Sequence, residues 1–328
     1  MNLYNLPSLS VSVGESHEAV TILVPAYKPE HLYTTLASID AQTYPRIKVI
    51  IGNHSPDEND HHMINDMAQR YDFEVIDTHL ICPGDQVAHY AYLWDQADSD
   101  LVRFVYDDDV IYPSSTSYLV DLADHHRDAV MFWHQRHWID GAGRFLRAPG
   151  FIDQDELMKS SRENILRLMA MHKNFIGEPS FVMMDRSKCA FTMTYAPLGE
   201  LAPRHYLGDV TSYLEATRHG PAVGGGAHLG AFRLHANQDS NKDNPRHTLG
   251  IVDWEMFMRY EYLGGNINRV TAEDWGRTVL QTYWAEMERR PQLRLFHSRL
   301  SADMAFNKLA SMSGFLQDYH ALRMNLAH

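Results

Sequence analysis

The first half of the chain alternates between short apolar runs and longer segments that carry apolar residues at helical spacing. The runs are rich in β-branched and aromatic residues, which is typical of buried strands. The expected strands are 20–24, 47–51, 73–76 and 101–106, and the expected helices between them are 30–40, 62–71 and 86–96. Strands separated by helices of this length form βαβ units with right-handed crossovers. The pattern therefore predicts an α/β fold built on a parallel sheet.

A ligand site is expected at the carboxyl ends of these strands, because open α/β sheets bind ligands there. Pro25-Ala26-Tyr27, Asn53-His54-Ser55 and Asp107-Asp108-Asp109 follow the first, second and fourth strands. No glycine-rich phosphate loop of the dinucleotide-binding or P-loop type follows the first strand. A dinucleotide-binding fold and a P-loop ATPase are therefore disfavoured.

The second half of the chain has a less regular pattern. A hairpin is expected around Asp140-Gly141-Ala142-Gly143, because a glycine turn separates two apolar runs there. The other expected elements are a helix at 155–172, a strand at 179–184, a helix at 210–217, a triple-glycine segment at 224–226 that leads into 229–235, and helices from Asp253 onward. We expect an N-terminal extension (1–19), one main domain (20–240) and a helical C-terminal region (241–328).

Composition limits the function classes. The 328 residues carry a formal charge of −13, which argues against non-specific nucleic-acid binding, since that requires a basic surface. Two cysteines form no disulfide framework and fit a reducing cytosol. No apolar stretch reaches the ~18–20 residues of a transmembrane helix, and residues 1–18 lack the pattern of a signal peptide. We therefore expect a cytoplasmic protein without a transmembrane segment, for which peripheral contact with the inner face of the membrane stays open.

Three consecutive carboxylates, Asp107, Asp108 and Asp109, end the fourth strand and precede Pro113. Adjacent carboxylates repel one another and cost stability unless a cation or solvent offsets the repulsion. Mg²⁺ and Mn²⁺ prefer carboxylate oxygens, and Mg²⁺ commonly takes one or two from protein and the rest from phosphate and water. The triplet therefore indicates a metal held against a phosphorylated substrate. The alternative is a solvated acidic turn.

At this point the chain resembles a known family. Val20 to Tyr27 is similar to the opening strand of family 2 glycosyltransferases, and Leu36 to Pro45, which ends in Gln-Thr-Tyr-Pro, is similar to the helix and turn that follow it. The aspartate triplet resembles the aspartate motif of the family, and Arg233-Leu234-His235 resembles its Arg-x-His. The resemblance covers roughly residues 20–240. It implies a GT-A fold, a Rossmann-like mixed and mostly parallel sheet flanked by helices, with 20–113 as the half that binds a nucleotide-diphosphate sugar and 114–240 as the half that binds the acceptor.

Two motifs depart from the family pattern. Gly52-Asn53-His54-Ser55 stands where the family has Asp-Asp-Gly-Ser, so Asn53 either contacts the base through its amide or makes no base contact. Tyr106 stands where an aspartate often begins the aspartate motif. We therefore interpret Asp108 as a ribose or outer metal carboxylate and Asp109 as the direct metal ligand, and we place Asp107 in the nucleotide-sugar site.

The resemblance also implies a chemistry. A divalent metal, Mn²⁺ or Mg²⁺, would neutralise the leaving diphosphate, and His235 either ligates this metal or hydrogen-bonds the diphosphate. In an inverting reaction a carboxylate deprotonates the acceptor hydroxyl. Asp209 matches the aspartate of the Glu-Asp motif, with Gly208 in place of the glutamate. Asp209 can serve as this base, as the N-cap of the helix near Val210, or as both. Glu178 and Glu200 are reserve candidates.

The remaining expectations concern the donor pocket, the partners and the competing functions. Pro25, Ala26 and Tyr27 are expected near the nucleotide, as are Gln86 and His89 on the third helix. The expected partners are a nucleotide-diphosphate sugar donor and a glycan or glycoconjugate acceptor, which suits polysaccharide biosynthesis. The C-terminal helices can pack on the catalytic domain, form a homodimer or rest on a membrane, and packing is the default. The competing functions are a non-catalytic nucleotide-sugar-binding scaffold and a sugar-phosphate nucleotidylyltransferase.

Overall fold

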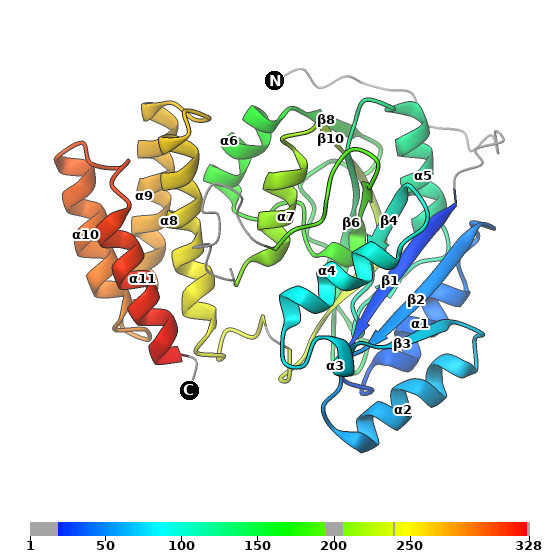
Figure 1. The fold of residues 1–328 in the computed structure, drawn as a ribbon. Coiled ribbons are helices and arrows are strands. Elements are labelled where there is room, and N and C mark those ends of the chain that lie inside the picture. Colours follow the sequence, from blue (N-terminus) through cyan, green and yellow to red (C-terminus); the bar gives the residue numbers. More distant parts are fainter. Residues whose placement is uncertain (1–18, 194–205, 239, 327–328) are drawn as a thin grey trace. The chain divides into compact units, whose positions relative to one another are not determined.

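The computed structural model describes residues 19–193, 206–238 and 240–326. The chain forms two compact units, which are described separately below (Figure 1). The first unit comprises the described residues up to Ser161 together with 176–192 and 215–235. The second comprises 162–175, the described part of 193–214 and the described residues from 236 onward. The domain boundary expected near residue 240 stays a prediction. The helix at 162–172 belongs to the second unit.

The first unit contains a mixed sheet whose strand order is β3-β2-β1-β4-β9-β6-β10-β5. Its strands are β1 (Val20–Ala26), β2 (Ile47–Asn53), β3 (Glu74–Asp77), β4 (Leu101–Phe104), β5 (Val110–Ile111), β6 (Met131–Asp140), β7 (Phe145–Arg147), β8 (Leu157–Ser160), β9 (Val182–Asp185) and β10 (Ala222–Leu234). The run β3-β2-β1-β4 is parallel, as is the long ladder between β6 and β10. The α/β sheet expected from the alternation of strands and helices is confirmed.

Helices cover both faces of the parallel strands. They are α1 (Leu32–Asp40), α2 (Glu58–Gln69), α3 (Thr78–Ile81), α4 (Gln86–Gln96) and α5 (Ser115–His125), and a 3₁₀ turn, η1 (Pro179–Phe181), precedes β9. All seven residues of β1 are buried, as expected for a strand covered on both faces. Val20, Ile22 and Val24 of β1 pack into one core with α1, α2 and α5. The helix α4 has the bounds expected from the sequence.

Two expectations for the second half are corrected. Residues 157–160 form β8 rather than the start of a helix, because they pair antiparallel with residues 222–225 of β10 and satisfy its backbone groups. The triple-glycine segment lies inside β10 rather than leading into it. A Cβ on Gly224 would lie 2.2 Å from a ring carbon of Trp133, and one on Gly225 would lie 2.7 Å from a ring carbon of Tyr118. Glycine is therefore required in this strand because large side chains occupy its face.

The second unit is helical. It contains α6 (Arg162–His172), most of α7 (Gly208–Ala216), α8 (His247–Leu263), α9 (Arg269–Glu286), α10 (Leu293–Ala305) and α11 (Ser313–Leu326). Fully buried Arg259 on α8 pairs with Glu255 at 2.7 Å and with Asp303 of α10 at 2.6 Å. Paired in this way, a buried charge is tolerated. The helical C-terminal region expected from the sequence is confirmed, and within the described residues no helix is both long and apolar enough to cross a membrane.

Candidate functional site

Asp107 joins the ends of two neighbouring strands. Its Oδ2 accepts hydrogen bonds from the backbone N–H groups of Tyr27, at 2.8 Å, and Lys28, at 3.0 Å. These two residues follow β1, and Asp107 follows β4, which pairs with β1. Burial raises the pKa of Asp107 to about 7, and the charge of Asp108 adds to the rise. Asp107 therefore fixes the loop after β1 against the acidic segment.

Asp108 contacts the end of β10. Its Oδ2 lies 3.0 Å from Nε2 of His235, within hydrogen-bonding distance. Its backbone oxygen accepts a hydrogen bond of 2.8 Å from Nε of Arg233. Arg233 and His235, the two motif residues expected at the site, therefore both contact the aspartate segment.

Asp109 is fully buried and bonded to protein. Its Oδ2 accepts a hydrogen bond of 2.6 Å from Ser180 Oγ, and its Oδ1 accepts one of 3.2 Å from the backbone N–H of Arg233. Its backbone oxygen accepts the hydroxyl of Thr35 at 2.8 Å. Burial raises the pKa of Asp109 well above its usual range, and Asp108 raises it further. A direct metal bond from Asp109 stays a prediction. In this structure Asp109 anchors the aspartate segment through its hydrogen bonds to Ser180, Arg233 and Thr35.

A cluster of metal-ligating side chains lies beside Asp108. Glu30, His31 and His235 each offer one ligand atom, and these atoms lie within 4.8 Å of one another. The ring of His31 meets the ring of His235 edge-on at 4.8 Å between centroids, and Nε2 of His31 lies 3.7 Å from Oε1 of Glu30. Burial lowers the pKa of His31, and the charge of Arg233 adds to the effect, which favours the neutral imidazole, the form that binds metals.

This donor set fits a divalent cation. Neutral imidazole and carboxylate are common ligands of divalent metals in proteins. His235, expected at the metal site, is joined there by Glu30 and His31, which the sequence did not mark. The only sequence signal for them was their position, a few residues after the first strand and beside the expected ligand site.

A buried polar network supports the acidic segment from within the sheet. Arg103 on β4 donates to the hydroxyls of Ser115, at 3.0 Å, and Thr116, at 3.3 Å, and to the backbone oxygen of Ser180. The side-chain oxygen of Gln42 accepts from the backbone N–H of Thr116 at 3.0 Å and from its hydroxyl at 2.8 Å. Since Ser180 also holds Asp109, the network links the Gln-Thr-Tyr-Pro segment to the site.

Asn53 is buried, and its side-chain amide is engaged by neighbours at the end of β2. Its Nδ2 donates to the backbone oxygen of His61 at 2.9 Å and to Oδ1 of Asn65 at 3.0 Å. Its Oδ1 accepts from the backbone N–H of Ser55 at 3.3 Å. Of the two interpretations of Asn53, these contacts favour the one without a base contact.

His89 lies inside the first unit and Gln86 lies on its surface. The His89 ring stacks on His54 with 4.4 Å between centroids, and burial lowers the pKa of His89 to about 3. His89 is therefore neutral near pH 7, and a contact with a phosphate stays a prediction. Gln86 is the first residue of α4 and is exposed.

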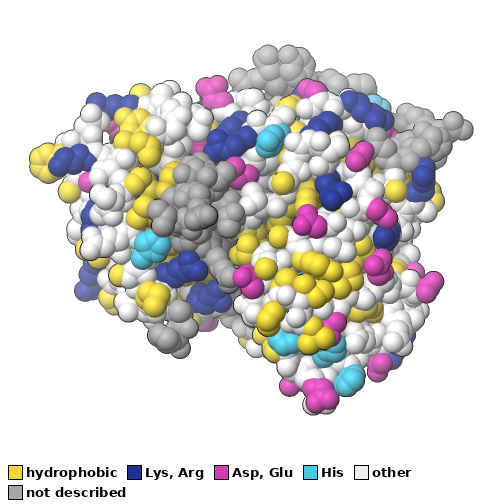
Figure 2. All heavy atoms as spheres, in the orientation of Figure 1, with side chains coloured by type: hydrophobic (Ala, Val, Ile, Leu, Met, Phe, Trp, Pro, Cys, Tyr) yellow, Lys and Arg dark blue, Asp and Glu magenta, His cyan; other side chains and the backbone are white. Residues whose placement is uncertain are grey.

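The end of β1 is partly open to ligands. Pro25 and Ala26 are buried and pair with β2. The side chain of Tyr27 is 48% exposed, so it is available to a ligand at this edge. Hydrophobic side chains also gather over α3 and α4 on the face shown in Figure 2. Leu80 and Ile81 of α3 are exposed.

The three candidate bases lie in different parts of the chain. Asp209 belongs to the second unit, in the first turn of α7, where its Oδ2 accepts a hydrogen bond of 3.0 Å from Nδ2 of Asn174. The helix begins at Gly208, so Asp209 lies within its first turn, where the helix dipole stabilises a negatively charged carboxylate. Glu178 of the first unit pairs with Arg136 at 2.7 Å. Glu200 lies outside the described residues.

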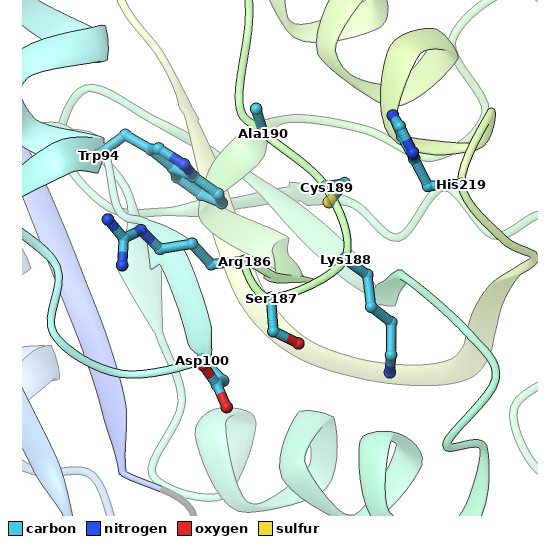
Figure 3. A pocket seen from close by; sticks show the side chains of 8 residues that line it. All are labelled: Trp94, Asp100, Arg186, Ser187, Lys188, Cys189, Ala190 and His219. Atoms are coloured by element: carbon cyan, nitrogen blue, oxygen red, sulfur yellow. The ribbon is translucent and has the colours of Figure 1, made fainter.

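A cavity of about 420 Å³ lies elsewhere in the first unit. Figure 3 shows its lining, which includes Trp94 at the end of α4, Asp100 just before β4, and Arg186 and Lys188 after β9. It therefore lies near the amino end of β4, whereas the acidic segment follows the carboxyl end. Lys188 is engaged by Asp185 at 2.5 Å and by the backbone oxygen of Arg127 at 2.8 Å. None of the site residues expected from the sequence lines this cavity.

Comparisons with known proteins agree with this geometry. The model of a family described as glycosyl transferase family 2 matches residues 21–190. A crystal structure of S. aureus TarS 1–349 is similar over 94% of this chain and 88% of that chain, with 12% identity and a TM-score of 0.57. Another, of TarS 1–349 in complex with UDP-GlcNAc, is similar over 94% and 92%, with 13% identity and a TM-score of 0.53. A comparison with curated protein sequences gave no match.

The likeness to these structures confirms the expected fold, a GT-A sheet flanked by helices and followed by C-terminal helices. The family match begins at the second residue of β1 and ends beyond β9, so it includes the aspartate segment and the Gln-Thr-Tyr-Pro turn. It spans more than half of the 328 residues. This chain belongs to glycosyl transferase family 2.

Proposed function

We propose that this chain transfers a sugar from a nucleotide-diphosphate donor to a hydroxyl group of a glycan or glycoconjugate acceptor, with inversion at the anomeric carbon and with a divalent cation. The observation that carries the proposal is the contact between Asp108 and His235 beside the end of β1 in a chain of this family. It brings two motifs that are 127 residues apart to one corner of the sheet.

The donor is proposed to lie across the carboxyl ends of β1 and β4. The exposed Tyr27 ring offers a stacking face for the base or sugar. Asp107 holds the backbone of the same loop, so the loop is ordered before the donor binds and binding does not have to supply that cost. One of the TarS structures is a complex with UDP-GlcNAc, and we therefore propose UDP-sugars, including a UDP-N-acetylhexosamine, as the first donors to test.

The cation is proposed to sit at the corner formed by Asp108 and His235. When bound, a divalent cation neutralises the negative charge that develops on the departing diphosphate. The protein's part is to hold the acidic segment in place. Asp107 and Asp109 do this through the loop after β1 and through Ser180, respectively.

Asp209 is proposed to take the proton from the acceptor hydroxyl. Its hydrogen bond from Asn174 fixes one carboxylate oxygen, and the carboxylate class suits this role. A base of this kind commonly contributes about 10²–10⁴-fold to a rate. Glu178 is a weaker candidate because Arg136 already binds its carboxylate at 2.7 Å.

The proposal is tested by incubating the purified protein with UDP-, GDP- and dTDP-sugars, Mn²⁺ and acceptor extracts, and by measuring nucleoside diphosphate release. We expect release with at least one donor, and we expect Asp209→Asn to slow acceptor-dependent release by about 10²-fold or more. NMR of the product then reads the anomeric configuration. Asp66→Asn on the exposed face of α2 is the matched control and is expected to behave like the wild type. Donor binding without any turnover would instead support the non-catalytic scaffold.

A further inference from the structure

His31 adds a second imidazole to the corner where the cation is proposed. It lies just before α1, and its side chain is 14% exposed. Its side chain makes no hydrogen bond that caps this helix. Capping of the helix therefore accounts for the backbone of His31 but not for the direction of its side chain. Its ring instead meets that of His235, which reaches the same place from the end of β10.

The ligand atoms are close enough to share one ion. Those of Glu30, His31 and His235 lie within 4.8 Å of one another. Metal–ligand distances of about 2.0–2.2 Å place two ligands of one ion up to ~4.4 Å apart. Movements of the ligand atoms by a few tenths of an ångström would thus suffice to bring all three within reach of one ion. The Glu30 side chain is 50% exposed, so solvent reaches this side of the set.

Asp108 supplies the support that metal-binding histidines commonly have. Its Oδ2 lies 3.0 Å from Nε2 of His235. A histidine that donates one ring N–H to a carboxylate keeps its lone pair on the other nitrogen, and its ring is held in a fixed orientation. Asp108 therefore orients His235 toward a metal, whereas buried Asp109 is engaged by Ser180 and by the backbone of Arg233.

Two imidazoles and one carboxylate favour a particular group of metals. Mg²⁺ prefers oxygen ligands and commonly relies on one or two carboxylates and substrate phosphates. Imidazole suits first-row transition ions, whose affinities rise from Mn²⁺ through Co²⁺ toward Zn²⁺. A site with two histidines should therefore hold such an ion through protein ligands alone.

We propose that His31, His235 and Glu30 form a metal site that binds a first-row transition ion before any nucleotide arrives and that discriminates against Mg²⁺. The proposal rests on the proposed function for its purpose, which is to present a preloaded cation to the donor diphosphate. The presence of the site does not depend on that function and can be measured in the protein alone.

The test uses the full-length protein, freed of metal by a chelator and then dialysed. Cobalt(II) chloride is titrated in while the visible absorption of the ion is followed, because imidazole coordination changes this spectrum. Competition with MgCl₂ follows. The variants are His31→Ala and Glu30→Gln, and His62→Ala on the exposed face of α2 is the matched control. Circular dichroism and thermal melting without metal show that each variant is folded.

We expect one Co²⁺ per chain, a spectrum that excess Mg²⁺ does not abolish, and an affinity at least about tenfold lower in His31→Ala. Glu30→Gln should weaken binding less, and His62→Ala should not change it. Equal Co²⁺ affinity in the wild type and a folded His31→Ala would overturn the site, as would displacement of Co²⁺ by an equal concentration of Mg²⁺.

Two results separate this site from the proposed transferase. Mn²⁺-dependent sugar transfer that survives unchanged in His31→Ala would overturn the site and keep the transferase. Co²⁺ binding that is lost in His31→Ala, in a protein that transfers no sugar from any donor, would keep the site and overturn the transferase.

Discussion

Ser180 has a larger role at the residue scale than its size suggests. Its hydroxyl donates to Asp109 at 2.6 Å and accepts the backbone N–H of Tyr106 at 2.9 Å, and its backbone oxygen accepts from Arg103. One serine therefore connects both ends of the turn between β4 and the aspartates. No sequence pattern marks it, because its partners are 71–77 residues away along the chain.

Replacing Ser180 with alanine should destabilise the first unit. Buried Asp109 would lose the shorter of the two hydrogen bonds to its carboxylate, and the N–H of Tyr106 would lose an acceptor. An unsatisfied buried polar group costs about 1–3 kcal/mol. The free energy of unfolding, measured by urea titration, should fall by this amount. Ser117→Ala, which removes a hydroxyl bonded to Ser114 on the exposed side of α5, should change it by less than about 0.5 kcal/mol. Equal effects of the two substitutions would contradict the role given to Ser180.

His89 gives a pH prediction. Burial lowers its pKa to about 3, whereas an unfolded chain has a histidine pKa near 6.5. Below pH ~6.5 the histidine of the unfolded state takes up a proton while His89 of the folded state stays neutral. The stability that the lowered pKa contributes is therefore fully present above that pH and declines as the pH falls toward 3. One such group costs about 2 kcal/mol by pH 5.

The measurement compares unfolding free energies at pH 7 and pH 5. The wild type should lose stability over this interval, and His89→Gln should lose about 2 kcal/mol less. His62→Ala, which removes an exposed histidine, should follow the wild type. An identical pH dependence in His89→Gln would show that His89 takes up a proton as readily in the folded state as in the unfolded chain and would contradict the lowered pKa.

At the element scale, the contact between β2 and α4 holds the end of the second strand in place. The backbone of Gly52 approaches this helix so closely that an added Cβ would lie 2.6 Å from Nε2 of His89 and 2.8 Å from Cδ1 of Leu93. Both side chains are buried. The glycine that replaces an acidic residue of the family pattern is thus explained by packing.

Gly52→Ala should therefore push α4 away from the sheet and cost about 1–3 kcal/mol of stability, as overpacking of cores commonly does. Gly150→Ala is the matched control, because the nearest atom to its added Cβ would be 3.7 Å away. Thermal melting of the two variants would measure the difference. A Gly52→Ala protein that melts with the wild type would mean that β2 and α4 are farther apart than described.

The elements also differ in how far their sequences determined them. The helix at 86–96 has the bounds that its sequence predicted, and the structure shows that Asp85 caps it by accepting from the N–H of Ala88. The start of α2 lies four residues earlier than expected, although Asp57 accepts from the N–H groups of Asn59 and Asp60 and is a recognisable N-cap. The strand β8 and the glycines of β10 were missed because pairing and large neighbouring side chains decide them, and neither is visible locally.

At the scale of the whole molecule, strand order brought the site together. The alternation of strands and helices predicted the sheet, and the resemblance to the family predicted the meeting of the aspartate segment with His235. They were not sufficient to find His31, because a histidine after a strand is ambiguous until the end of β10 is placed beside the loops that follow β1 and β4. The expected homodimer through the C-terminal helices stays a prediction that the mass of the protein in solution can test.

The central claim is that a cation at the corner of Asp108 and His235 binds the donor diphosphate. Calorimetric titration of UDP-GlcNAc into the full-length protein, with Mn²⁺ and then with EDTA, tests it most directly. The account predicts binding with Mn²⁺ that is lost with EDTA and is weakened at least about tenfold in Asp108→Asn, but not in Asp66→Asn. Binding of the same strength with and without the cation, unchanged in Asp108→Asn, would contradict it.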